Sequence, residues 1–132
     1  MRFLHWFVAG FVATLVFHQG LLAVLHARGI SPRPAWNMAA TQPLGVPQVI
    51  SLAFWGGVWA IAIGYAMGLL GWYGAWVWIV AGAILPSVVA LGVVFPAKGL
   101  PVDRKTVIGA LLLNAAWGLG VVLILELLAR LV

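Results

Sequence analysis

The sequence predicts an all-α polytopic membrane protein with four transmembrane helices in an antiparallel bundle. Hydrophobic residues make up 65% of the 132-residue chain and charged residues only 7%, and the mean hydropathy is +1.16. A soluble domain carries roughly 25% charged residues, so most of this surface must face something other than water. Four apolar stretches reach the roughly 20 residues that a helix needs to cross the hydrocarbon core. Proline or glycine lies in each break between them.

We expect one membrane domain over residues 1–132, with spans at about 3–27, 47–70, 73–96 and 106–131. The first break is rich in proline, which removes a backbone donor and disfavours helix at the preceding residue. Gly71 and Gly74 bound a tight reversal that makes the second and third spans neighbours. The first span starts like a signal peptide at Arg2, but no small-residue cleavage site follows, so we expect it to stay uncleaved.

The basic residues indicate the orientation. Five of the seven lie in the first and third connections, namely Arg28, Arg33, Lys98, Arg104 and Lys105. The opposite side carries Arg2 and Arg130. By the positive-inside rule, the two connections are cytoplasmic and both termini lie outside.

The distribution of charge and of reactive side chains excludes several function classes. The net charge is +5, but the basic residues form no run or face that could follow a phosphate backbone, so no nucleic-acid partner is expected. The chain has no cysteine, which excludes thiol chemistry and disulfides. His5, His18 and His26 lie on the first span, with neighbouring pairs about 20 Å and 12 Å apart along the axis, too far to share a metal ion. We expect no metal, no cofactor and no catalytic residue set.

Small residues predict close helix packing. On the second span they recur every four residues, as Gly56, Ala60, Gly64 and Gly68, and the fourth span carries a shorter stripe of Ala110, Asn114 and Gly118. Such a stripe forms a groove in which another helix can approach closely. A weak repeat also relates Trp6 and Gly10 to Trp78 and Gly82 at an offset of 72, and Trp55-Gly56 resembles Trp117-Gly118. Two parallel copies of a helical hairpin would explain this pattern.

Polar residues inside the spans need a reason, because hydrocarbon cannot hydrogen-bond to them. His18, Gln19, Ser87 and Asn114 all fall roughly 12–14 Å from the cytoplasmic ends of their spans, which predicts a polar layer at one depth. One interpretation is that these groups hold helices together, with Asn114 bonded to His18 or Gln19. The other is a hydrated pocket that opens to the cytoplasm, with the first connection as its lid.

The fourth span ends with a possible ion pair. Glu126 precedes Arg130 by four residues, which is the favourable order on a helix, and both would lie near the membrane interface.

Four segments carry a resemblance that covers nearly the whole chain. They are His18-Gln19-Gly20, Thr41-Gln42-Pro43-Leu44-Gly45-Val46-Pro47-Gln48-Val49-Ile50-Ser51-Leu52, Phe54-Trp55-Gly56-Gly57 and Asn114-Ala115-Ala116-Trp117-Gly118. With these segments the chain resembles a group of small uncharacterised four-helix bacterial inner-membrane proteins. The resemblance implies the fold and the bacterial inner membrane, and it implies no activity.

We therefore expect a non-enzymatic membrane protein that acts by helix association, as a homodimer or as an accessory subunit of a larger membrane complex. The alternative is a minimal dimeric transporter or channel built around the polar layer. An enzyme on lipid substrates comes third, because no catalytic pair is visible. The expected partners are the bilayer and a second copy or a larger complex.

Overall fold

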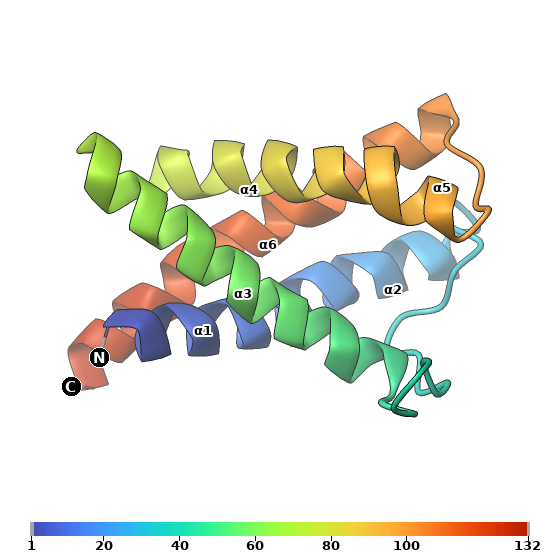
Figure 1. Cartoon of the computed structure of the whole chain (residues 1–132), viewed down its shortest axis with the longest axis horizontal. Coiled ribbons are helices and arrows are strands. Elements are labelled where there is room, and N and C mark those ends of the chain that lie inside the picture. Colours follow the sequence, from blue (N-terminus) through green and yellow to red (C-terminus); the bar gives the residue numbers. More distant parts are fainter. Residues whose placement is uncertain (1, 132) are drawn as a thin grey trace.

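Four helices of membrane length make up the computed structural model, which describes residues 2–131 (Figure 1). The first span joins α1 (Arg2–Ala13), the π-helical turn η1 (Thr14–His18) and α2 (Gln19–Ala27). The second is α3 (Gln48–Leu70). The third joins α4 (Ala75–Val89), a second π-helical turn η2 (Ala90–Val94) and α5 (Phe95–Ala97), and the fourth is α6 (Arg104–Leu131). All four are long and apolar enough to cross a membrane, which confirms the prediction of an all-helical chain with four helices of membrane length.

The largest differences from the expected boundaries have local causes. The fourth span begins at Arg104, not at 106, because Asp103 caps it: its Oδ1 accepts hydrogen bonds from the Thr106 amide at 2.8 Å and the Thr106 hydroxyl at 2.7 Å. These bonds hold the pKa of Asp103 below its ordinary value. The third span begins at Ala75, not at 73, because Gly71 and Gly74 take the positive φ angles of 70° and 120° that the reversal requires.

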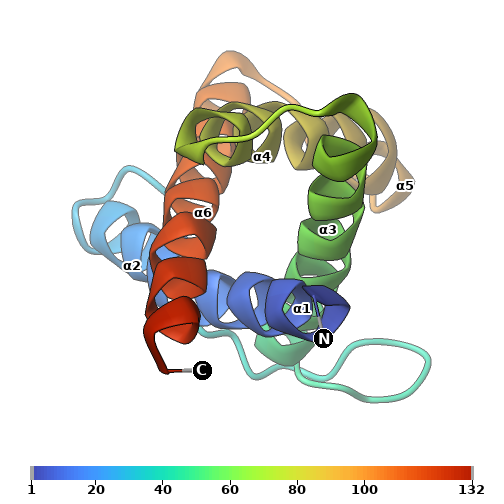
Figure 2. The same cartoon turned by 90° about the vertical axis from the view of Figure 1, so that its left-hand side faces the viewer.

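The spans surround a common axis. Figure 2 shows α1, α3, α4 and α6 as the four sides of a square. Three of its corners are closed by packing, α1 on α3, α1 on α6 and α4 on α6, whereas α3 and α4 meet only slightly. Both termini lie at one end, and the two longer connections, 28–47 and 98–103, lie at the other (Figure 1). We call the latter the loop end.

Glycines let the paired helices approach to backbone contact. A Cβ on Gly10 of α1 would lie 2.7 Å from the Ala60 Cβ and 2.8 Å from the Gly56 carbonyl carbon, so α1 fills the groove expected on α3. Gly64 continues this groove against the Trp6 ring. Gly68, the last member of the expected stripe, has nothing within 4 Å of a Cβ.

The second pair of helices repeats this arrangement. A Cβ on Gly118 of α6 would lie 3.0 Å from the Ile79 Cα of α4, and a Cβ on Gly82 of α4 would lie 3.3 Å from the Gly118 Cα. The crossing of α1 with α3 at Gly10 and Gly56 thus has its counterpart in the crossing of α4 with α6 at Gly82 and Gly118. These are the residues that the sequence repeat relates, so the geometry supports two copies of one hairpin.

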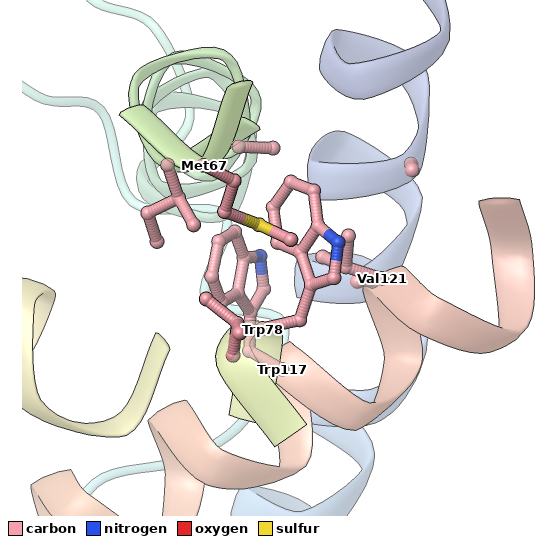
Figure 3. Close-up of a cluster of buried hydrophobic side chains, with 9 residues drawn as sticks. Met67, Trp78, Trp117 and Val121 are labelled. Carbon is pink, nitrogen blue, oxygen red and sulfur yellow. The ribbon is translucent and has the colours of Figure 1, made fainter. Parts of the chain in front are cut away.

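The buried core lies between the four spans, on the terminal side of their midpoint. Met67 of α3 reaches toward the indoles of Trp78 and Trp117, and Val121 packs beside them (Figure 3). Trp117 is only 3% exposed. A flexible thioether fills the irregular space between two rigid rings well.

Alanine at Gly10 or Gly118 should destabilise the fold, because its methyl group would meet backbone that cannot move aside. We expect a loss of about 1–3 kcal/mol for either substitution, as for other overpacked cores. Gly68→Ala is the matched control and should be neutral or slightly stabilising, because its methyl group meets open space and alanine favours helix. Thermal unfolding in mild detergent, followed by circular dichroism, measures both. Equal melting of Gly10→Ala and Gly68→Ala would contradict the close crossing.

Candidate functional site

A cavity of about 740 Å³ occupies the loop end of the bundle. Residues of all four spans line it, together with residues 29–34 and 37 of the first connection. Its lining is mainly apolar, with a few polar groups, and its volume falls within the range of roughly 300–1,000 Å³ that is usual for small-molecule sites. We call it the loop-end cavity.

The expected polar layer forms two hydrogen-bonded pairs at this cavity. The Gln19 amide contacts His18 Nδ1 at 3.0 Å, and Asn114 Nδ2 donates to the Ser87 hydroxyl at 2.9 Å. His18, Gln19 and Asn114 line the cavity, while Ser87 lies behind Asn114 and is 1% exposed. Asn114 thus bonds across to α4 and not to His18 or Gln19, because α6 packs most extensively on α4.

The protonation of His18 follows from its neighbours. The backbone amide of Trp36 donates to Gln19 Oε1 at 2.8 Å, and an amide N–H can only donate, so this bond fixes the orientation of the Gln19 side chain. Gln19 Nε2 must then donate to His18 Nδ1, which has to carry a lone pair. In this arrangement His18 is neutral and its proton sits on Nε2.

Two hydrogen-bonding atoms of the polar layer have no protein partner. Within residues 2–131, neither His18 Nε2 nor Asn114 Oδ1 makes a hydrogen bond. No fully buried side-chain nitrogen or oxygen of the described residues lacks a partner, so these two atoms must be accessible. Both residues line the loop-end cavity, which therefore offers one donor and one acceptor to a ligand or to water.

The deep end of the cavity is closed where all four spans meet. Trp117 of α6 donates its indole N–H to the Gly10 carbonyl of α1 at 3.0 Å, and the Thr14 hydroxyl donates to the same oxygen at 2.9 Å. A Cβ on Gly56 of α3 would lie 3.2 Å from the Trp117 Nε1, and one on Gly82 of α4 would lie 3.1 Å from the Trp117 ring. Sequence analysis did not single out this junction. Two features of the sequence could have indicated it: a hydroxyl residue, Thr14, four residues after Gly10 on the first span, and the Trp117-Gly118 pair on the fourth span.

The first connection is fastened to the wall of the cavity. The Trp36 indole donates to the Leu15 carbonyl at 2.8 Å, in addition to the bond from the Trp36 amide to Gln19. Leu15 lies in the π-helical turn η1, where hydrogen bonds span five residues and the ladder is locally rearranged, a feature that is frequent at functional sites. Residues of this connection thus cover the cavity, as the expected lid would.

Charged side chains of the cavity lie only at its mouth. Arg33 of the first connection places its guanidinium 4.4 Å from the centre of the Phe95 ring of α5, so the connection reaches the third span. Lys105 and Asp103 complete the charged lining. Asp103 keeps its negative charge, which accepts two hydrogen bonds from Thr106 and is attracted to Lys105, so the two cations and one anion of the mouth carry a net charge of +1.

The remaining site residues lie elsewhere. Ala110 lines the loop-end cavity. Glu126 lines a smaller cavity of about 340 Å³ at the terminal end, together with Arg2 and Gly68. Its pairing with Arg130 stays a prediction. Residues 2–131 contain no group of three or more histidine, cysteine or acidic side chains that could hold a metal ion.

Removing the indole donor at the junction should weaken the whole bundle. In Trp117→Phe the Gly10 carbonyl keeps only the Thr14 bond and the core loses part of a ring, so we expect a loss of about 1–3 kcal/mol. Trp72→Phe is the control, because Trp72 is 56% exposed. Thermal unfolding in the same detergent compares the two variants. If both variants melted at the temperature of the unmodified chain, the Trp117 indole would not stabilise the bundle as expected.

Comparison with known proteins assigns this chain to no family. No protein-family model, no curated protein and no solved structure matches this chain. The functional argument therefore depends on the geometry of the loop-end cavity.

Proposed function

We propose that this chain is an integral membrane protein of the transporter type, which holds a small ligand in the loop-end cavity. The observation that carries the proposal is the pair of open hydrogen-bonding atoms, His18 Nε2 and Asn114 Oδ1, beside a cavity of about 740 Å³. Polar groups that served only to hold helices together would satisfy one another, because an unpaired group in hydrocarbon is costly.

The cavity has one closed end, which favours a carrier over an open channel. The junction of Trp117, Gly10 and Thr14 lies at its deep end, and the core of Figure 3 continues beyond it. Carriers that alternate their access have this form in each state, with the ligand site near mid-membrane between repeated units. The matched crossings of the two hairpins support the same mechanism. Movement of one hairpin against the other, or association with a second copy of the chain, would open the closed end of the cavity toward the terminal side.

The proposal also includes the direction of the helices, the membrane that holds them and their orientation in it. The bundle is antiparallel, it lies in a bacterial inner membrane, and the loop end faces the cytoplasm with both termini outside. The grouping of both termini at one end and of the basic connections at the other supports this orientation (Figure 1).

Association with a second copy or with a larger membrane complex is the second candidate. Its supporting observation is an exposed aromatic pair on α3, where Phe54 and Trp55 lie edge to face and are 48% and 57% exposed. Rigid aromatic side chains of this kind are good contact groups for a partner helix. A homodimer or an accessory subunit would cover them.

Water should reach the deep polar residues but not the lipid-facing side of the same helices. In this chain without cysteine, we expect His18→Cys and Asn114→Cys to react in membranes with a thiol reagent that needs water. Leu113→Cys, which also lines the cavity and removes no hydrogen bond, should react as well. Val88→Cys should not react, because Val88 is 61% exposed on the outside of α4, and Ser87→Cys should be protected behind Asn114. Protection of all three cavity positions, with co-purification of a partner chain, would favour association instead.

The C-terminus should lie outside the cytoplasm. Alkaline phosphatase fused after Val132 should be active, because it folds only outside, and green fluorescent protein at the same position should be dark. The two fusions measured side by side control each other. A bright fluorophore with an inactive phosphatase would reverse the proposed orientation.

A further inference from the structure

Helix packing does not close the side of the loop-end cavity between α3 and the third span. Three corners of the square are packed, but α3 and α4 make little contact, and α3 has no substantial contact with η2 or α5. Cavity-lining residues face each other across this gap, Leu52 and Trp55 on α3 and Ala90 and Phe95 on the third span. Trp55 is 57% exposed and Leu52 is 39% exposed, as residues beside an opening would be. We call this gap the side opening.

The end that faces water is more covered than the side that faces lipid. Residues 29–34 of the first connection line the cavity at the loop end, and Arg33 contacts Phe95 of α5. The bonds from Trp36 to Gln19 and Leu15 hold the connection in place. A ligand that enters through the side opening therefore comes from the bilayer.

The lining of the cavity has an apolar part and a cationic part, which match the apolar chains and the negatively charged phosphate of an anionic lipid. Apolar residues of α3 and the third span flank the side opening, which suits hydrocarbon chains. Arg33 and Lys105 lie at the mouth, and they outnumber the single anion there, Asp103, which interacts with Lys105 and Thr106. Deeper in the cavity, His18 offers an N–H donor and Asn114 an acceptor oxygen.

We propose that the ligand of the loop-end cavity is an anionic glycerophospholipid, which enters through the side opening between α3 and the third span. This inference rests on the proposed function. Its phosphate lies between Arg33 and Lys105, which can donate charge-assisted hydrogen bonds. The acyl chains leave between α3 and the third span into the hydrocarbon.

Thermal unfolding of the purified full chain in a neutral detergent tests the proposal with three probes. Phosphatidylglycerol should raise the melting temperature by several degrees, because a ligand that binds only the folded state stabilises it. Phosphatidylcholine with the same acyl chains should raise it less, and free glycerol phosphate should leave it unchanged. Equal stabilisation by both lipids would overturn the role of the two cations.

Charge-removing variants distinguish the site from general attraction of anionic lipid. Arg33→Gln and Lys105→Gln should each weaken the apparent affinity for phosphatidylglycerol about tenfold or more, as expected for a lost charge-assisted hydrogen bond. Arg28→Gln and Lys98→Gln are matched controls, because these cations lie at the same end but do not line the cavity. Equal weakening by all four variants would contradict a specific site.

A bulky residue in the side opening tests the route. Ala90→Trp should reduce stabilisation by phosphatidylglycerol while the variant itself remains folded, because Ala90 lines the cavity beside the opening. Val89→Trp is the control, since Val89 is 38% exposed and does not line the cavity. Full stabilisation of Ala90→Trp by phosphatidylglycerol would contradict entry from the side.

Failure of this inference is distinguishable from failure of the proposed function. If glycerol phosphate stabilised the chain as well as phosphatidylglycerol, the ligand would be a soluble anion and the lipid would be wrong, while the cavity would still be a binding site. If no probe stabilised the chain but the cavity cysteines reacted, the lipid would again be wrong alone. Cavity cysteines that stay protected in membranes without anionic lipid would overturn both.

Discussion

The Gly10 carbonyl is the point on which this bundle depends. It accepts one hydrogen bond from the Trp117 indole of α6 and one from the Thr14 hydroxyl of its own span. Lipid chains are as apolar as leucine, so burial of apolar side chains gives little drive for helices to associate inside a bilayer. Close backbone contact and hydrogen bonds must therefore drive the association of the helices. The wide indole fits here because glycines of α3 and α4, Gly56 and Gly82, leave space on either side.

This junction also determines where a site can exist. On its terminal side lies the buried core with Met67, Trp78 and Trp117 (Figure 3), and the cavity beyond that core is smaller, about 340 Å³. On its loop-end side the spans diverge, and the space between them holds polar side chains whose hydrogen bonds no single helix pair can complete. Two of the four polar residues use one hydrogen-bonding atom each for a neighbour and present another to the cavity. Tight packing at the centre and an open end are therefore two results of the same crossing.

The sequence predicted the helices well because their length and composition are local properties. Apolar stretches of sufficient length, bounded by proline and glycine, predicted four membrane-length helices, and the cap by Asp103 only moves the start of α6 from 106 to Arg104. The depth of His18, Gln19, Ser87 and Asn114 could also be counted along each helix. Which of them bond to each other depends on helix rotation and on which helices are neighbours. No residue spacing within one span contains that information, so the Asn114 bond to Ser87 and the role of Trp117 appeared only in three dimensions.

The π-helical turn η1 has a consequence for how one span serves two neighbourhoods. A π-turn amounts to one extra residue in the helix, and one residue corresponds to about 100° of rotation about the axis. The segment after Thr14–His18 is therefore turned relative to a continuous α-helix. Before the turn the span presents Gly10 to its packing partners, and after it the span presents Gln19 to the first connection. Because the bulge accommodates one extra residue, deletion of one of residues 15–17 would restore an unbroken helix and leave Gln19 and Leu22 of α2 on the side that they now face. An α-helix that kept every residue of this turn would instead direct both side chains about 100° away from that side.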